Sequence, residues 1–118
     1  MENSELKFDL SFLNKISGGD REFIVEMINT FKEQVPEFIQ NSQRYLGEKN
    51  YESLSREAHK FLPGVSFLGI RELEPEVALI EEYAKKRENL DKLEPLLSSA
   101  IAKINEIIIS FDKEFGLS

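Results

Sequence analysis

The chain contains a single histidine, His59, and no cysteine. A neutral imidazole offers a ring nitrogen that can act as a nucleophile near pH 7, because the reference pKa of the side chain is about 6.5. A phosphoryl group on this nitrogen forms a phosphoramidate, which is labile enough to be given away again. Such a site needs a cation for the phosphoryl oxygens, and Arg56 and Lys60 are close in the sequence. His59 is therefore a candidate phosphoryl acceptor, although a lone surface histidine most often has no chemical task.

The residues around His59 predict a helix with a narrow apolar seam. The seam positions alternate three and four residues apart and are Tyr51, Leu54, Ala58, Phe61, Val65 and Leu68. At about 100° per residue they fall within roughly 80°, and His59 lies about 130° from their centre. We therefore expect the imidazole ring to point away from the core.

Several neighbours of His59 are expected on the same outer face of this helix. Arg56 and Lys60 can supply positive charge there, and Pro63 with Gly64 can provide a flat surround for another protein. Phe67 lies outside the seam, and an exposed aromatic near an exposed imidazole indicates a docking surface. The residues that we assign to docking are Ser55, Leu62, Pro63, Gly64, Ser66 and Phe67.

Helical spacing of apolar residues covers almost the whole chain, and no segment shows the sustained alternation of a strand. This pattern predicts an all-α protein. Proline damages a helix interior, so Pro36 is expected to bend or divide the second helix, and Pro63 to disturb the histidine helix. Asn50 can cap the histidine helix, and Gly69 closes it. Before it we expect a short helix over about 10–17 and a long helix capped by Asp20. After it we expect a helix from about Arg71 or Pro75 to Arg87 and a last helix capped by Asn89 or Asp91.

Each of these helices has one apolar side that can face a shared core. Four substantial helices with short loops predict an antiparallel up-and-down four-helix bundle, with the short N-terminal helix across one end. We expect one domain over 1–118, and Met1 with the lack of a linker favours a free-standing protein. The positions expected to face the core are Phe8, Phe12, Leu13 and Ile16, then Phe23, Ile24, Met27, Ile28, Phe31, Val35, Phe38 and Ile39, then Leu73, Val77, Ile80 and Ala84, and finally Leu93, Leu96, Leu97, Ala100, Ile101, Ile104, Ile108 and Phe111.

Composition excludes several classes of protein. A net charge of -7 and a pI near 4.8 argue against nucleic-acid binding, which needs clustered Lys and Arg. No apolar run approaches the ~20 residues of a membrane span, and the first ten residues are acidic and polar rather than a secretory signal. The absence of cysteine excludes disulfides and thiolate metal sites and fits a reducing cytoplasm. We expect a cytoplasmic monomer that binds no metal.

The segment AHKFLPGVSFLG resembles the histidine-containing phosphotransfer domain family. The motif of that family opens with Ala-His, continues with Lys and small residues, and reaches Leu-Gly or Val-Gly ten residues after the histidine. Ala58, His59, Lys60, Leu68 and Gly69 stand in the matching places. The upstream stretch FDLSFLNKISGGDREFIVEMINTFKEQVPEF is similar to the family's entry helix, Gly-Gly turn and long second helix. The resemblance covers about 8–86.

This resemblance implies a function for His59. Its Nε2 would attack an aspartyl phosphate on a receiver domain and later donate the phosphoryl group to a second receiver, with Lys60 and Arg56 stabilising it. The chain itself would bind no cofactor, because the receiver would contribute Mg²⁺. It would be a carrier rather than a kinase, since neither a glycine-rich nucleotide loop nor a Walker motif is present.

The sequence departs from the family pattern directly after the histidine. The family commonly has Lys three positions after the histidine and Gly at the fourth, whereas this chain has Leu62 and Pro63, with Gly64 displaced by one. Lys60 is a candidate replacement for the missing cation. The departures bear on partner preference and transfer rate.

Other functions explain the sequence less well. A di-iron bundle needs two Glu-x-x-His motifs, and the chain has one histidine. The acidic and basic pairs Glu81-Glu82 and Lys85-Lys86 are typical of solvated helix faces. A serine nucleophile lacks the strand-turn-helix elbow that would present it. The alternative that stays open is an adaptor with the same bundle, which docks or sequesters response regulators without being phosphorylated.

Overall fold

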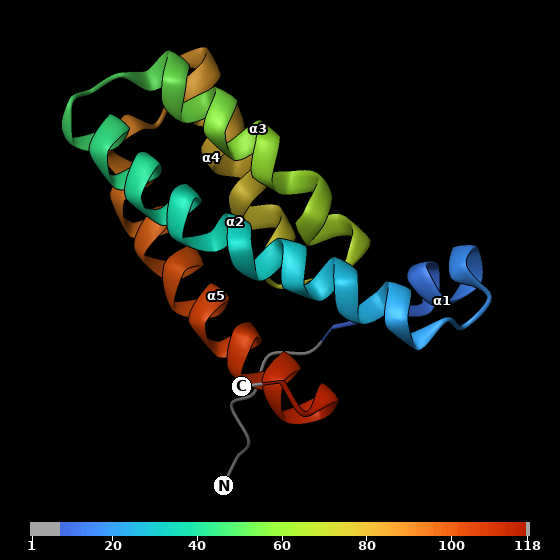
Figure 1. Cartoon of the computed structure of the whole chain (residues 1–118). Helices are drawn as coiled ribbons and strands as arrows, with labels where there is room; N and C mark the ends of the chain where they lie inside the picture. Colours follow the sequence, from blue (N-terminus) through green and yellow to red (C-terminus); the bar gives the residue numbers. More distant parts are fainter. Residues whose placement is uncertain (1–7, 118) are drawn as a thin grey trace, which may run out of the picture.

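The computed structural model describes residues 8–117, and in that part of the chain every regular element is helical (Figure 1). The predicted all-α class is confirmed. None of these helices is both long and apolar enough to cross a membrane. The elements are α1 (Ser11–Ser17), α2 (Arg21–Gly47), α3 (Tyr51–Phe67), α4 (Glu74–Lys86), the short 3-10 helix η1 (Leu90–Lys92) and α5 (Leu93–Phe115).

The four long helices form the bundle, and α1 lies at one end of it (Figure 1). Around the bundle α2 packs against α3, α3 against α4, α4 against α5 and α5 against α2. Short connections join consecutive helices, so neighbours run antiparallel. The predicted bundle with an additional short N-terminal helix is confirmed.

The starts of α2 and α3 are capped as the sequence predicts. The side chain of Asp20 accepts hydrogen bonds from the amides of Glu22 (3.0 Å) and Phe23 (3.4 Å). The side chain of Asn50 accepts one from the Ser53 amide (3.2 Å). These contacts satisfy amides that have no partner within their own helix, and they fix where each long helix begins.

The inner face of α3 is locked into the core by aromatic packing. Phe61 stacks on Phe38 of α2 with ring centroids 4.1 Å apart, and Phe31 of α2 lies 5.4 Å from Phe61. The predicted seam is buried at Leu54, Ala58, Phe61, Val65 and Leu68, and Tyr51 is half-buried. Because this face is held inward, the opposite face of α3 is held toward solvent.

Neither proline inside a long helix divides it. Pro36 lies within α2 and Pro63 within α3, and both helices are continuous across them. Both side chains are exposed. A proline on the outer side leaves a carbonyl without its helical donor where water can replace it. The expectation that Pro36 could divide the second helix was wrong.

The predicted caps of the last helix were also wrong. Asn89 and Asp91 belong to the η1 region, and the cap position of α5 is Lys92, which makes no side-chain capping bond. Asn89 adopts a left-handed backbone with φ of 51° and begins the 3-10 turn. Leu90 packs partly against the core and sets this extra turn before α5. Of the two expected starts of the fourth helix, Arg71 and Pro75, the second is correct, because α4 begins at Glu74 and Pro75 lies in its first turn.

Helix α1 buries less than the sequence predicts. Leu13 is buried and Phe8 packs on Phe111 with ring centroids 4.5 Å apart. Phe12 and Ile16, however, are 49% and 56% exposed. A two-turn helix at the end of a bundle touches the core along one narrow line, so its remaining apolar side chains face outward.

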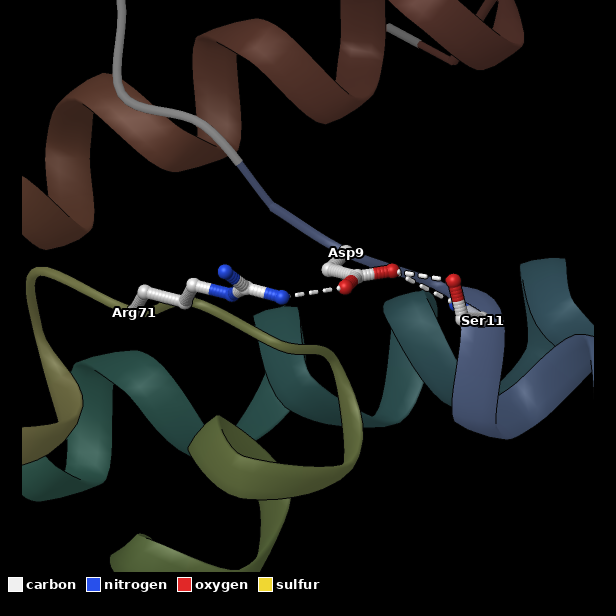
Figure 2. A network of polar contacts seen from close by, with 3 residues as sticks. All are labelled: Asp9, Ser11 and Arg71. Carbon is white, nitrogen blue, oxygen red and sulfur yellow. Dashed lines mark hydrogen bonds and ion pairs between the residues drawn. The ribbon is translucent and has the colours of Figure 1, made fainter.

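The segment that leads into α1 is fastened over the end of α3 (Figure 2). The Asp9 amide donates to the Gly69 carbonyl (3.0 Å). Gly69 has φ of 63°, and a Cβ there would lie 2.0 Å from the Asp9 carbonyl oxygen. Any residue other than glycine would therefore meet both backbone strain and a clash at this crossing.

The Asp9 carboxylate is the centre of this fastening. One oxygen accepts bonds from the Ser11 hydroxyl (2.5 Å) and amide (2.9 Å), and the other lies 2.6 Å from the Arg71 guanidinium (Figure 2). These contacts, first the Ser11 hydroxyl, then its amide and then Arg71, lower the pKa of the Asp9 carboxyl below its ordinary value. We call Asp9, Ser11, Gly69 and Arg71 the α1 clamp.

Candidate functional site

His59 lies on the outer face of α3, on the side where α4 packs. Its side chain is 76% exposed, which confirms the predicted direction of the ring. Its Nδ1 lies 2.8 Å from Oε2 of Glu81 on α4. The histidine is thus exposed to solvent and at the same time anchored to a second helix.

The Glu81 contact determines which ring nitrogen is free. An ionised carboxylate only accepts hydrogen bonds, so Nδ1 carries the proton of the neutral ring and donates it to Glu81. The lone pair then resides on Nε2, which faces away from Glu81. The arrangement prepares Nε2 as a nucleophile and holds the ring in one orientation.

Glu81 was missed as a site residue, and its expected place on a solvated face was wrong. Its side chain is only 21% exposed. It follows the buried Ile80 directly, so it stands at the edge of the α4 face that packs on α3. The sequence does show that Glu81 lies beside the apolar stripe of its helix. It does not show which neighbouring helix this side of the stripe packs against.

Three residues assigned to docking are covered at least in part by the rest of the bundle. Ser55 is 8% exposed, and its hydroxyl donates to the Glu81 carbonyl (3.2 Å), so it links α3 to α4 instead of facing a partner. Leu62 is partly buried against the core. Gly64 faces α2, where a Cβ would lie 3.5 Å from the Gln34 side chain. The expected outward position of Ser55 was wrong because α4 covers this flank of α3. Leu62 and Gly64 are half-buried, and their role in docking stays a prediction.

The two predicted cations flank His59 but already have partners. Nη1 of Arg56 lies 3.3 Å from Glu52, one turn earlier in α3. Nζ of Lys60 lies 3.8 Å from Glu37 of α2 and 4.0 Å from Glu57. Lys60 is therefore drawn toward the α2 side of α3, whereas the His59 ring is held on the α4 side.

An open cleft of about 840 Å³ lies beside His59. We call it the α3–α4 cleft. His59, Glu81 and the buried Ala84 contribute to its lining. Its other lining residues include four cations, namely Arg56 and Lys60 from α3, Lys85 from α4, and Arg87 at the end of α4. A negatively charged group carried by His59 would enter this basic surround.

The remaining docking candidates lie on the surface toward the end of α3. Pro63 and Ser66 are exposed, and the Ser66 hydroxyl donates to Glu74 of α4 (2.7 Å). Phe67 is 41% exposed and stacks on Phe12 of α1, with centroids 5.7 Å apart and planes at 6°. Phe12 was missed as a surface residue, since its apolar spacing predicted burial.

The fold and the site together define a class of protein: a helical bundle that presents one carboxylate-supported histidine to solvent. Residues 26–110 match the family model of the Hpt domain, and the chain belongs to this family. Hpt domains are phosphotransfer carriers that act with receiver domains in two-component phosphorelays, which gives the chain a general role in histidine phosphotransfer. No curated protein and no solved structure matches the chain significantly.

Within residues 8–117, no three histidine, aspartate or glutamate side chains gather in a way that could hold a metal ion. The acidic residues next to His59 are accounted for by other contacts. Glu81 binds the ring, Glu52 pairs with Arg56, and Glu57 lies near Lys60. The carboxylates of this region therefore bind side chains of the protein itself.

Proposed function

We propose that Nε2 of His59 accepts a phosphoryl group from a receiver-domain aspartate and passes it to another receiver. The observation that carries this proposal is the 76% exposed ring whose Nδ1 is bound by Glu81. Membership of the Hpt family supports the class of reaction. The chain has one histidine, so no second imidazole competes for the role.

The transfer is a displacement at phosphorus. The Nε2 lone pair forms the P–N bond while the P–O bond to the aspartate breaks, and the aspartate leaves as a carboxylate with the electron pair. No proton has to leave Nε2, because the ring proton is on Nδ1. The phosphorylated ring becomes cationic, and the Glu81 carboxylate stabilises that charge through the Nδ1 hydrogen bond. Attack by a second receiver's aspartate reverses these steps.

The chain contributes few catalytic groups of its own in this proposal. Mg²⁺ is a component of the receiver, where it would neutralise phosphoryl charge. His59 and Glu81 supply a nucleophile that is held in position before the partner arrives. A carrier of this kind needs no nucleotide site, in keeping with the absence of a glycine-rich nucleotide loop.

The receiver would dock across the outer face of α3 and the adjoining α1. Phe67 lies eight residues beyond His59, about 12 Å along the helix axis at 1.5 Å per residue. Together with Phe12 and Ile16 it forms an exposed apolar patch, which we call the aromatic patch. A partner interface of ordinary size, about 800 Å² per side, can cover both the patch and the His59 ring.

A labelling experiment tests this function. The protein is mixed with a receiver domain carrying radioactive aspartyl phosphate, and label on the chain is assayed for acid lability and alkali stability. The wild type should gain such label and His59→Gln should gain none, while the two proteins should give the same thermal melting curve. If the wild type stays unlabelled, or if His59→Gln is labelled, His59 is not the acceptor.

The same experiment addresses the adaptor alternative. An adaptor would bind the receiver without accepting the label, and its affinity would be unchanged in His59→Gln. Binding measured by calorimetry beside the labelling assay separates the two functions. The anchored and exposed His59 ring favours the carrier.

A further inference from the structure

Phosphorylation of His59 would bring a strongly charged group into the α3–α4 cleft. A phosphoryl group at neutral pH carries a charge of about -1.5 to -2 and three acceptor oxygens. Four cations line the cleft, and they differ in whether they already contact another residue. The cation that serves the phosphoryl group should be one whose hydrogen-bond donors are free and whose side chain reaches the ring.

Three of the four cations are engaged elsewhere. Arg56 pairs with Glu52 and also donates to the Ser53 hydroxyl (3.4 Å). Lys60 lies between Glu37 and Glu57 on the α2 side of α3. The guanidinium of Arg87 lies over the Tyr51 ring, 5.9 Å from its centroid. Recruiting any of these three requires an existing contact to be given up.

Lys85 is the exception among them. Its side chain is exposed, lines the cleft and makes no ion pair or hydrogen bond with another residue of the described chain. The neighbouring Lys86 is different, because it pairs with Glu82 one turn earlier in α4 (3.5 Å). Lys85 therefore has all three ammonium donors available for an incoming anion.

The antiparallel packing of α3 and α4 brings Lys85 toward His59. Ser66 meets Glu74, and His59 meets Glu81, so positions advance along α4 as they recede along α3. Lys85 thus lies one turn beyond Glu81, beside the turn of α3 that precedes His59. Helical side chains lean toward the N-terminus of their own helix. In antiparallel neighbours this tilts Lys85 and the His59 ring toward each other.

The geometry points to Lys85 as the residue that binds the phosphoryl oxygens on Nε2 of His59. This inference rests on the proposed function. It explains how the chain can work with Leu62 at the third position after the histidine, since the cation comes from α4 instead of from α3. Glu81 and Lys85 are one turn apart on the same helix, so one face of α4 supplies both the carboxylate for Nδ1 and the ammonium for the phosphoryl group.

Three variants test the assignment. Lys85→Gln removes the charge, Lys85→Arg retains it, and Lys86→Gln removes the same charge one position along α4, outside the lining of the cleft. Each is mixed with a phosphorylated receiver at a series of receiver concentrations, and single-turnover transfer to His59 is followed by label. The rate at saturating receiver and the half-saturating concentration are obtained separately.

We expect Lys85→Gln to lower the saturating rate by about tenfold or more, the size of one lost charged contact in a transition state. Lys85→Arg should restore most of this rate, and Lys86→Gln should match the wild type. Equal saturating rates in Lys85→Gln and wild type would overturn the role of Lys85 while leaving the proposed function intact. A change confined to the half-saturating concentration would also overturn it, because Lys85 would then only help to dock the receiver. Absence of label on the wild type would remove both proposals.

Discussion

The contact between His59 and Glu81 joins the reactive ring to a second helix. Its contribution can be measured by comparing phosphoryl-transfer rates of Glu81 variants. The side chain in Glu81→Gln can still accept a hydrogen bond from Nδ1–H but has no negative charge, and Glu81→Ala has neither the acceptor nor the charge. We expect transfer to fall in the order wild type, Glu81→Gln, Glu81→Ala. A hydrogen bond to a charged group is worth about 1.5–3 kcal/mol, so transfer in Glu81→Ala should be about 10- to 160-fold slower.

The exposed neighbour Glu82 provides the matched control, because it pairs with Lys86 and does not touch His59. Glu82→Ala should transfer at the wild-type rate. Nitrogen NMR of the imidazole offers a second readout, since the wild-type ring should carry its proton on Nδ1 and the Glu81→Ala ring should lose this preference. Equal rates for Glu81→Ala and Glu82→Ala would refute the positioning role of Glu81.

At the scale of single residues, the sequence predicts direction along one helix but not contacts between helices. The outward direction of His59 follows from the periodicity of α3 alone, and it is confirmed. Ser55 lies on the flank of α3 that α4 covers, and Gly64 lies on the flank that faces α2. The sequence could not predict that Glu81 contacts His59, because this contact depends on how far α3 and α4 are shifted relative to each other along the bundle axis.

At the scale of elements, the α1 clamp predicts a pH-dependent attachment of α1. The contacts to Asp9 lower the pKa of its carboxyl, so the folded clamp holds the proton less strongly than an unattached aspartate. The stabilisation is therefore complete above the ordinary aspartate pKa of about 3.9, and it is lost as the pH falls through the lowered value. Acidification should weaken the attachment of residues 8–10 to the end of α3, while the Asp9 amide bond to Gly69 does not depend on this carboxyl.

Amide resonances of Asp9 and Ser11 in a pH titration would follow this loss of the carboxylate contacts. Ser11→Ala should move the transition to higher pH, and Arg71→Met should do so by less, because the Ser11 hydroxyl is the larger cause of the lowered pKa. Ser98→Ala, an exposed serine on α5, serves as the control and should leave the transition unchanged. Identical transitions in wild type and Ser11→Ala would contradict the assigned cause.

Element boundaries were predictable wherever a local signal sets them. Asp20 and Asn50 cap their helices through amides two or three residues away, so the sequence contains the whole interaction. The effect of Pro36 depends on exposure, which the tertiary packing decides. Asn89 failed as a cap because Leu90 packs on the core and inserts a 3-10 turn before α5.

At the scale of the whole molecule, the bundle follows from amphipathic helices and short loops, but the surface it presents does not. Apolar spacing predicts burial for Phe12 and Ile16, although only Leu13 of α1 is buried. A helix at the end of a bundle has too little core to cover all of its apolar residues. Exposed apolar side chains that gather near a reactive group indicate a contact surface, and sequence periodicity cannot separate them from core residues.

The aromatic patch yields a prediction about receiver binding. Phe67→Ala and Ile16→Ala should each raise the half-saturating receiver concentration, with a loss of about 1–2 kcal/mol for an interface side chain of this kind. The saturating transfer rate should stay near the wild-type value, because neither side chain touches His59. Both residues are at least 41% exposed, so the variants should fold normally, which a melting curve verifies.

The comparison residue for the patch is Ile109, which is 64% exposed on α5, the helix diagonal to α3 in the bundle. Ile109→Ala removes similar exposed apolar area from a face that the His59 site does not share. It should leave both the half-saturating concentration and the rate unchanged. If Phe67→Ala and Ile109→Ala had the same effect, the receiver would not dock over α1 and α3. A higher half-saturating concentration for Phe67→Ala and an unchanged one for Ile109→Ala would mean that the receiver binds over the aromatic patch, which places docking and chemistry on one face of the molecule.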